Sequence, residues 1–261
     1  MGLSKKQRQI FWFGQTKYNA LICDGAVRSG KTSIMSLAFV LWAMREFNGC
    51  NFAFCGKSVG SVERNVVTPL LAITGSYNRG AHVIVIRRGN VENRFYLFGG
   101  RDESSYMLIQ GITLAGVMLD EVALMPRSFV EQALARCSVD GAKFWFNCNP
   151  ENPEHWFRKE WILKPEEKKA LYIHFTMDDN PSLSEETKER YKTMYSGVFY
   201  QRYILGLWVM AEGIIYDMFD REANVYHEPP IDMVDRSIRS IACDYGTTNP
   251  CVFLDIYDDG E

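Results

Sequence analysis

The sequence contains no paired cysteine motif, no metal-ligand spacing among its four histidines and no apolar run long enough to cross a membrane. Its longest strongly apolar stretch, Ile34–Met44, is well short of the ~20 residues that a membrane-spanning helix needs. The seven cysteines are never spaced as Cys-x-x-Cys, which argues against a zinc site or a disulfide framework. We therefore expect reduced, buried thiols in a cytosolic protein.

Basic charge is not in excess either, because 29 Lys and Arg stand against 32 Asp and Glu. The overall field does not attract a polyanion, so any nucleic acid would have to meet a local basic surface. We expect no signal peptide, since Lys5, Lys6 and Arg8 lead into only a brief aromatic patch. With 261 residues and 47% hydrophobic content, the composition is that of a globular protein of one large domain, or of one domain with an appendage.

Through the first 150 residues, short apolar runs alternate with segments of helical periodicity. Strands are predicted at Ala20–Asp24, Asn51–Cys55, His82–Arg87, Arg94–Phe98, Tyr106–Gln110, Gly116–Asp120 and Lys143–Cys148. Helices are predicted at Lys31–Phe47, at Ser61–Thr74 with Ser61 as cap and a kink at Pro69, and at Arg127–Cys137. This alternation predicts an α/β fold whose mostly parallel sheet has helices on both faces.

After Pro150 the pattern changes to charged, amphipathic helices over Glu154–Leu163 and Ser184–Tyr195. Residues 221–235, which contain Pro229-Pro230, are predicted to be a linker. Two strands, Ile238–Tyr245 and Cys251–Tyr257, would form a C-terminal β-hairpin. A two-stranded hairpin is not a domain by itself, so we expect it to be the beginning of a second one.

Residues 25–32 match the phosphate-binding pattern G-x-x-x-x-G-K-[ST] at every fixed position, after a predicted strand and at the start of a predicted helix. Backbone N–H groups of such a loop surround phosphate oxygens, Lys31 would reach the β- and γ-phosphates, and the Thr32 hydroxyl would ligate Mg²⁺. An ordinary glycine turn is the alternative. The candidate ATP-binding residues are Gly25, Ala26, Val27, Arg28, Ser29, Gly30, Lys31 and Thr32.

Two carboxylates, Asp120 and Glu121, follow an apolar strand about 90 residues after this loop. Asp120 would hold Mg²⁺ through water, and Glu121 would orient and polarise the attacking water. Kinases and GTPases have less need of the second acid, so the pair favours an ATPase. The alternative is a surface strand end with two solvated acids.

Four further side chains are candidates, each beside a simpler interpretation. Arg28 could act on the γ-phosphate as an arginine finger supplied in cis, or face outward and pair with an acid. Asn147 and Asn149 could sense the γ-phosphate and couple its loss to the segment beyond, or could merely start a turn. Gln7, or Gln9, could read the adenine edge, although a capped amphipathic helix explains the same residues equally well.

Taken together, these residues resemble the large terminase subunit of tailed bacteriophages. The resemblance rests on the Gln7 region, the Gly25–Thr32 loop, Leu119-Asp120-Glu121, Asn147–Pro150, Asp179–Ser184 and Tyr200–Trp208. Many members place the loop arginine one residue earlier, where this chain has Val27. The run Ile241–Gly246 is similar to the first strand of the family's RNase H-like nuclease, whose leading aspartate, here Asp244, binds metal.

The resemblance implies an ASCE-type (RecA-like) P-loop ATPase domain over residues 1–220, with a core over about 1–176 and a small helical subdomain over about 177–220. Linker 221–235 and a truncated nuclease beginning at 236–261 would follow. It also implies ATP and Mg²⁺ as ligands, and Mg²⁺ or Mn²⁺ for the nuclease of a longer chain. Since the other nuclease acids would lie beyond Glu261, this chain is expected not to cleave DNA.

The expected partners are double-stranded viral DNA, a portal protein and a small terminase subunit, in the host cytoplasm and away from membranes. The chain would form a homo-oligomeric ring on the procapsid and be a monomer in isolation. Two alternatives belong to other classes. A helicase or other nucleic-acid-dependent ATPase should show a second RecA-like repeat or helicase motifs, which this chain lacks. A nucleotide-dependent structural switch would bind ATP without needing Glu121.

Overall fold

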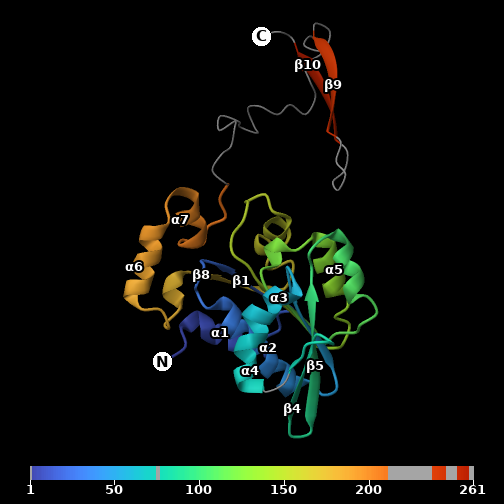
Figure 1. Ribbon diagram of the computed structural model, residues 1–261, viewed down its shortest axis with the longest axis vertical. Coiled ribbons are helices and arrows are strands. Elements are labelled where there is room, and N and C mark those ends of the chain that lie inside the picture. The colour runs from blue at the N-terminus through green and yellow to red at the C-terminus, as the bar shows by residue number, and fades with distance from the viewer. Residues whose placement is uncertain (1, 75–76, 211–236, 245–251, 259–261) are drawn as a thin grey trace. The chain divides into compact units, whose positions relative to one another are not determined.

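The apolar runs of residues 20–175 lie side by side in one sheet of the computed structural model (Figure 1). Its order is β3-β4-β5-β2-β6-β7-β1-β8. The six strands β5, β2, β6, β7, β1 and β8 are parallel, and β4 and β3 form an antiparallel edge next to β5. The bounds are β1 Ala20–Gly25, β2 Asn51–Gly56, β3 Tyr77–Asn78, β4 Val83–Arg88, β5 Val91–Gly99, β6 Gly116–Leu119, β7 Lys143–Asn147 and β8 Ala170–Phe175. The prediction of a mostly parallel sheet is confirmed.

The structure describes residues 2–74, 77–210, 237–244 and 252–258. The chain divides into two compact units, residues 1–212 and 213–261. The predicted linker 221–235 lies outside the described residues, so the predicted domain boundaries stay predictions.

Both faces of the sheet are covered, because successive side chains of a strand point to opposite faces. In β1, Leu21 and Cys23 join one apolar cluster, whereas Ala20 and Ile22 join the other. Helices α1 (Lys5–Phe13), α2 (Lys31–Glu46) and α4 (Thr68–Thr74) contribute to the first cluster. Helices α5 (Arg127–Ala135) and η4 (Arg158–Ile162) contribute to the second. This confirms the predicted α/β layering.

The predicted strand Tyr106–Gln110 is wrong. A 3₁₀ helix, η2, spans Glu103–Ile109, and the Asp102 carboxylate caps it by accepting from the Ser104 backbone N–H at 3.1 Å. The apolar residues of this segment resemble a short strand, but a carboxylate directly before it satisfies the first free N–H groups and favours a helical turn.

The predicted helix Ser61–Thr74 is broken into three pieces and begins earlier. Its cap is Ser58, not Ser61, and the pieces are α3 (Val59–Val62), the π-helix η1 (Glu63–Val67) and α4. The Thr68 backbone N–H donates to the Glu63 carbonyl five residues back. Pro69 has no N–H to continue the helical ladder, which accounts for the irregular turn just before it.

Two further differences lie after Pro150. The predicted helix Glu154–Leu163 is shorter, with helical residues from 156 to 162, and most of it is the π-helix η4. No strand was expected at Ala170–Phe175, where β8 pairs with β1 at the edge of the sheet. An edge strand between two charged segments shows only partial alternation of apolar residues, and β8 is accordingly buried only at Ala170, Ile173 and Phe175.

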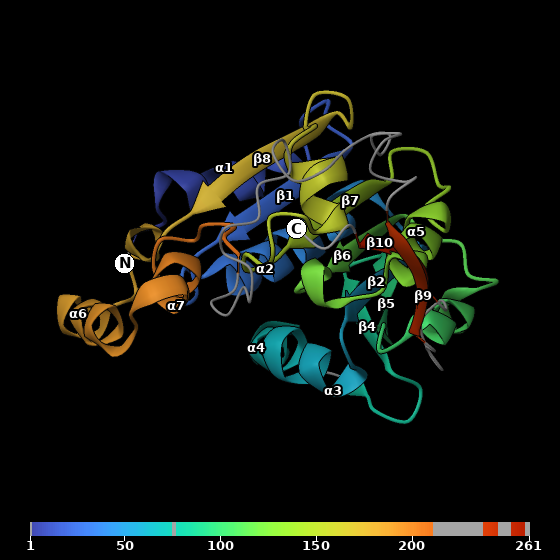
Figure 2. The same ribbon diagram turned by 90° about the horizontal axis from the view of Figure 1, so that it is seen from above.

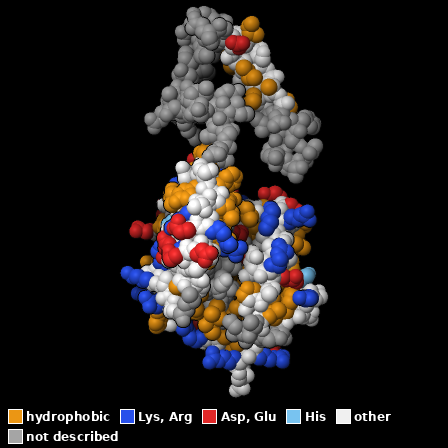
Figure 3. All heavy atoms as spheres, turned by 60° about the vertical axis from the view of Figure 1, so that its left-hand side comes forward, with side chains coloured by type: hydrophobic (Ala, Val, Ile, Leu, Met, Phe, Trp, Pro, Cys, Tyr) orange, Lys and Arg blue, Asp and Glu red, His pale blue; other side chains and the backbone are white. Residues whose placement is uncertain are grey.

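Beyond β8, the first unit contains the short 3₁₀ helix η5 (Met177–Asp179) and two α-helices. Helix α6 spans Glu185–Met194, and the predicted cap is confirmed because the Ser184 hydroxyl accepts from the Thr187 N–H at 3.2 Å. Helix α7 spans Gly197–Tyr203. Figure 2 shows both helices beyond the carboxyl end of β8. Figure 3 shows both acidic and basic side chains on this side of the unit, and α6 carries the ion pairs Lys188–Glu185 and Lys192–Glu189.

The second unit contains the antiparallel pair β9 (Ile238–Asp244) and β10 (Val252–Asp258). Both strands agree with the predicted hairpin to within a residue. The predicted turn, residues 246–250, lies outside the described residues.

Phe39 of α2 is fully buried among five aromatic rings at centroid distances from 5.3 to 6.1 Å. Phe39→Ala should lower the free energy of unfolding by about 3–5 kcal/mol, because it removes this packing and leaves a cavity. Leu41→Ala, at an exposed position of the same helix, should cost less than about 1 kcal/mol. Urea unfolding checks both, and equal costs would contradict the assignment of the core.

Candidate functional site

The phosphate-binding sequence forms a sharp turn between β1 and α2. Gly25 and Gly30 have φ angles of 122° and 80°, and a Cβ on Gly25 would lie 1.9 Å from the Phe175 carbonyl oxygen. The Ala26 N–H donates to that carbonyl at 2.8 Å, and the Val27 N–H donates to the Tyr203 carbonyl at 3.0 Å. The backbone N–H groups in the first half of the loop therefore donate to other segments of the chain. The first N–H groups of α2 have no partner within the helix, so this end of the loop suits an anion.

Lys31 lies inside this turn and is only 5% exposed. Its Nζ donates to the carbonyl oxygens of Gly25 and Ala26, at 3.0 and 2.8 Å, and to the Asn149 Oδ1 at 3.2 Å. Burial lowers the pKa of Lys31, while the charge of Glu121 opposes that shift. The ammonium is thus held at the place where a phosphate chain would meet the loop.

Thr32, Asp120 and Asn147 form one hydrogen-bonded group. The Thr32 Oγ1 donates to the Asp120 Oδ1 at 3.0 Å, and the Asn147 Nδ2 donates to the same oxygen at 2.9 Å. The Asn147 Oδ1 accepts from the Glu121 backbone N–H at 2.9 Å. The other Asp120 oxygen accepts from the Asn65 Nδ2 at 3.1 Å. The two predicted Mg²⁺ ligands are therefore adjacent, and one of the two predicted coupling asparagines joins them.

Glu121 and Asn149 are joined at two points. The Asn149 backbone N–H donates to Oε2 of Glu121 at 3.0 Å, and the Asn149 Nδ2 donates to Oε1 at 2.8 Å. Since Asn149 also accepts from Lys31, its amide connects the lysine to the glutamate. Burial raises the pKa of Glu121, with the Lys31 charge opposing it. Glu121 has a left-handed φ of 58°, a strained conformation that is concentrated at functional sites.

These groups line a cleft of about 410 Å³. It is bounded by Val27, Arg28, Ser29, Gly30, Lys31, Thr32, Ser33, Asn65, Glu121, Asn149, Asn180 and Leu183. Among the described residues, no three His, Cys, Asp or Glu side chains are grouped as a metal site. Mg²⁺ is commonly bound through one or two protein oxygens together with substrate phosphates and water. The hydroxyl of Thr32 and the carboxylate of Asp120 are such hard oxygen donors.

Arg28 is exposed, with a left-handed φ of 58°. Its Nε donates to the Tyr191 hydroxyl at 3.0 Å, and its carbonyl oxygen accepts from the Asn180 Nδ2 at 2.7 Å. The alternative interpretation paired this guanidinium with an acid, whereas the contact seen is to a tyrosine of α6. Arg28 lines the cleft together with Lys31, which is the placement that a phosphate-directed role needs.

Gln7 belongs to a capped helix and also lies beside the loop. The Ser4 N–H donates to the Gln7 Oε1 at 3.0 Å, and the Gln7 N–H donates to the Ser4 hydroxyl at 3.2 Å, so the capped helix is confirmed. Gln7 is 3% exposed, and its Nε2 lies 3.3 Å from where a Cβ of Gly30 would be. Gln9 is exposed. Adenine recognition by either residue stays a prediction.

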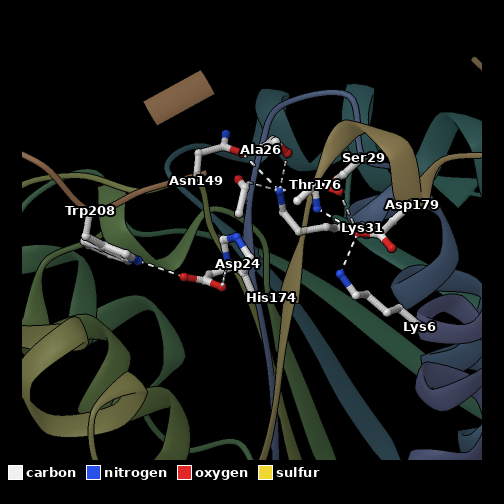
Figure 4. A network of polar contacts seen from close by, with 11 residues as sticks. Lys6, Asp24, Ala26, Ser29, Lys31, Asn149, His174, Thr176, Asp179 and Trp208 are labelled. Atoms are coloured by element: carbon white, nitrogen blue, oxygen red, sulfur yellow. Dashed lines mark hydrogen bonds and ion pairs between the residues drawn. The ribbon is translucent and has the colours of Figure 1, made fainter. Parts of the chain in front are cut away.

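The sequence patterns missed two parts of this region. Asn65 comes from the irregular helix η1, and no motif marks it. Asp24, the residue before the loop, is fully buried. Its Oδ1 is 2.9 Å from the His174 Nδ1, and its Oδ2 accepts from the Trp208 indole N–H at 2.8 Å (Figure 4). An acid at the end of the apolar run of β1 was the available signal.

The family model for the terminase large subunit, T4likevirus-type, N-terminal, matches residues 22–223. This chain belongs to the large terminase family. A crystal structure of the large terminase from a thermophilic bacteriophage is 53% identical, with a TM-score of 0.78 over 97% of this chain and 64% of that one. The same thermophilic-phage terminase in complex with ATP-gamma-S is 51% identical, with a TM-score of 0.76 over 97% of this chain and 64% of that one.

The fold extends to more distant large terminases. The ATPase domain of the Thermus phage P74-26 large terminase shares 15% identity, with a TM-score of 0.58 over 80% of this chain and 94% of that one. That similarity concerns the fold alone. A comparison with curated protein sequences returned no significant match. The resemblance inferred from the sequence motifs is confirmed.

The His174–Asp24 pair should make stability depend on pH. The hydrogen bond to Asp24 raises the pKa of His174, with burial opposing it. A raised histidine pKa stabilises the folded state fully below the unfolded value of ~6.5, and the effect is lost as pH rises through the folded pKa. His174→Gln should therefore cost most in denaturant midpoint at low pH and progressively less at high pH.

His155 provides a control of opposite sign, because burial lowers its pKa. A lowered histidine pKa penalises the folded state as pH falls, so His155→Gln should cost less at low pH than at high pH. Urea midpoints measured across ~pH 5 to 9 compare the two variants. A pH-independent cost for His174→Gln would show that its ring is neutral in this pair.

Proposed function

We propose that this chain hydrolyses ATP at the β1–α2 loop, and that hydrolysis drives translocation of viral double-stranded DNA into a procapsid. The observation that carries the proposal is the Asn149 amide, which joins the Lys31 ammonium to the Glu121 carboxylate in one cleft. A binding-only module needs the lysine, but it has no need of a half-buried carboxylate beside it.

The loop supplies the phosphate site. The N–H groups at the start of α2 and the buried Lys31 would bind the phosphate oxygens, with Thr32 completing the turn. Arg28, at the rim of the same cleft, would reach the γ-phosphate as charge develops during transfer. Positioning together with charge stabilisation is the main contribution that a protein makes to phosphoryl transfer.

Glu121 would act on the attacking water. Burial raises the pKa of Glu121, so its carboxylate binds a proton more tightly than a solvated glutamate does. This makes Glu121 a stronger base for the attacking water. The two hydrogen bonds from Asn149 fix the direction of its oxygens. Loss of the γ-phosphate would change the surroundings of Lys31 and Asn149 together, which supports the coupling role of Asn149.

Thr32 and Asp120 would hold Mg²⁺, since they offer the hydroxyl and carboxylate oxygens that this ion prefers. When bound, the ion neutralises charge on the β- and γ-phosphates. Asn147 keeps the Asp120 carboxylate directed toward Thr32 by bonding to the oxygen that Thr32 also contacts. Asn65 restrains the second oxygen by donating a hydrogen bond to it.

Family membership and the nucleotide complexes of a similar protein support the wider proposal. Structures of the thermophilic-phage large terminase contain ADP or ATP-gamma-S. This chain spans 64–65% of the length of those terminase chains. We infer that it works with double-stranded DNA, a portal protein and a small terminase subunit, as a ring on the procapsid in the host cytoplasm. No helix of the described residues is long and apolar enough to cross a membrane.

The nuclease assignment rests on Asp244, the last residue of β9. Its backbone pairs with Val252 of β10, and its side chain lies outside the described part of the structure. A two-metal nuclease draws carboxylates from several strands, so a single aspartate does not make a site. Metal binding by Asp244 therefore stays a prediction.

Lys31→Ala should weaken both nucleotide binding and turnover, because it removes a phosphate ligand. Glu121→Gln should keep ATP and Mg²⁺ binding but lower the hydrolysis rate by ~10²-fold or more, since it removes the base and leaves the phosphate site intact. Glu160→Gln, at a half-buried acid paired with Arg127, is the control and should hydrolyse normally. Near-normal turnover by Glu121→Gln would falsify the assignment.

Arg28→Ala should separate a transition-state role from ground-state binding. If Arg28 acts as charge develops, the catalytic rate should fall by ~10²-fold or more while ATP affinity changes little. Arg190→Ala, which removes a neighbouring arginine of α6, should leave both values near those of the unmodified chain. A loss of affinity with the rate preserved would make Arg28 a ground-state ligand, and no change in either would make it a surface residue.

A further inference from the structure

The segment Tyr203–Trp208 lies against the first half of the phosphate loop, although the two are far apart in sequence. The Tyr203 carbonyl accepts from the Val27 N–H at 3.0 Å. A Cβ on Gly206 would lie 2.6 Å from the Ala26 nitrogen and 2.8 Å from the Gly25 Cα. The backbone at residue 206 thus packs directly on the backbone of the loop, with room for no side chain between them.

The same segment bonds to the strand that carries the loop. The Trp208 indole N–H donates to Asp24 at 2.8 Å, and His174 bonds to the other oxygen of that carboxylate at 2.9 Å (Figure 4). Asp24 is 0% exposed, so these two bonds supply polar partners that a buried carboxylate requires, with Tyr172 as a further hydrogen-bond partner. Removing either donor would leave part of a buried charge unsatisfied beside the loop.

These contacts fall on successive residues of the chain. Trp208 contacts Asp24, Gly206 packs on Gly25 and Ala26, and Tyr203 bonds to Val27. The carbonyl oxygens of Gly25 and Ala26 are in turn the ones that receive the Lys31 ammonium. The segment therefore contacts the same loop residues whose carbonyl oxygens accept from Lys31.

We propose that Trp208, acting through Asp24, is a positioning residue for nucleotide binding, and that docking of residues 203–208 and occupancy of the phosphate loop strengthen each other. The proposal rests on the nucleotide-binding function proposed above. A loop already held in its binding conformation loses less freedom when phosphate binds, which raises affinity. Because such coupling is reciprocal, bound nucleotide must also hold the segment more firmly.

The first test measures affinity. Trp208→Phe keeps an aromatic ring and removes only the indole donor, and it should raise the Kd for ADP and for ATP-gamma-S by about tenfold in calorimetric titration. Gly206→Ala disturbs the same docking through a different contact and should have a similar effect, because its φ of 70° and its crowding both disfavour a side chain. Trp156→Phe is the matched control, since Trp156 packs against the same apolar cluster as Trp208 without contacting Asp24.

The second test measures docking in the unmodified chain. Chymotrypsin should cleave after Tyr203, Leu205, Leu207 or Trp208, and ADP should slow this cleavage at least severalfold. Trp208→Phe retains a cleavable aromatic residue, and it should show faster cleavage and less protection by ADP. A purely structural role for Trp208 would not make the cleavage rate depend on nucleotide.

The outcomes are distinct. Weakened affinity in both variants, with ADP protection in the unmodified chain and Trp156→Phe unchanged, supports the proposal. Unchanged affinity in folded Trp208→Phe and Gly206→Ala overturns it, as does cleavage of the unmodified chain at a rate independent of ADP. Because the cleavage measurement with ADP uses the unmodified chain, it tests the proposal even where a variant does not fold. If the unmodified chain binds neither nucleotide, the proposed function itself fails.

Discussion

The burial of Lys31 is the constraint from which the rest of the site follows. An ammonium that is 5% exposed loses most of its hydration, and it is tolerated only where acceptors surround it. Two loop carbonyls, the Ser29 hydroxyl and Asn149 supply those acceptors. Their positions then require the turn at Gly25, the strand end that carries Asn149, and the carboxylate that Asn149 contacts.

The same electrostatic balance explains why so many amides surround the acids. Asp120 and Glu121 are consecutive in the chain; burial raises the pKa of Glu121, and the charge of neighbouring Asp120 adds to that shift. Amide side chains bond to carboxylates without adding charge, so Asn65, Asn147 and Asn149 satisfy the oxygens while leaving the charge to act on a ligand. An arginine or lysine in these positions would neutralise the acids instead.

The sequence alone predicted those features whose chemistry allows only a few residue types. The loop pattern, the two acids and the strands that deliver them were predictable, because phosphate binding requires those residues in that order. Asn65 and Trp208 were not, because their roles arise from segments brought together by packing. The strand predicted at Tyr106–Gln110 failed for a related reason, since the Asp102 cap outweighed a short apolar run whose period was ambiguous.

The exposure of the individual cysteines determines which thiols a labelling reagent can reach. Cys23 and Cys148 lie beside the phosphate loop, are fully buried and have thiol pKa values raised by that burial, so they resist alkylation and oxidation. Cys50 is partly exposed on the first unit, and Cys243 is exposed on the second. Maleimide dyes would therefore react with the surface thiols first and leave the nucleotide site chemically intact. The natural sequence thus offers labelling positions on each unit for distance measurements.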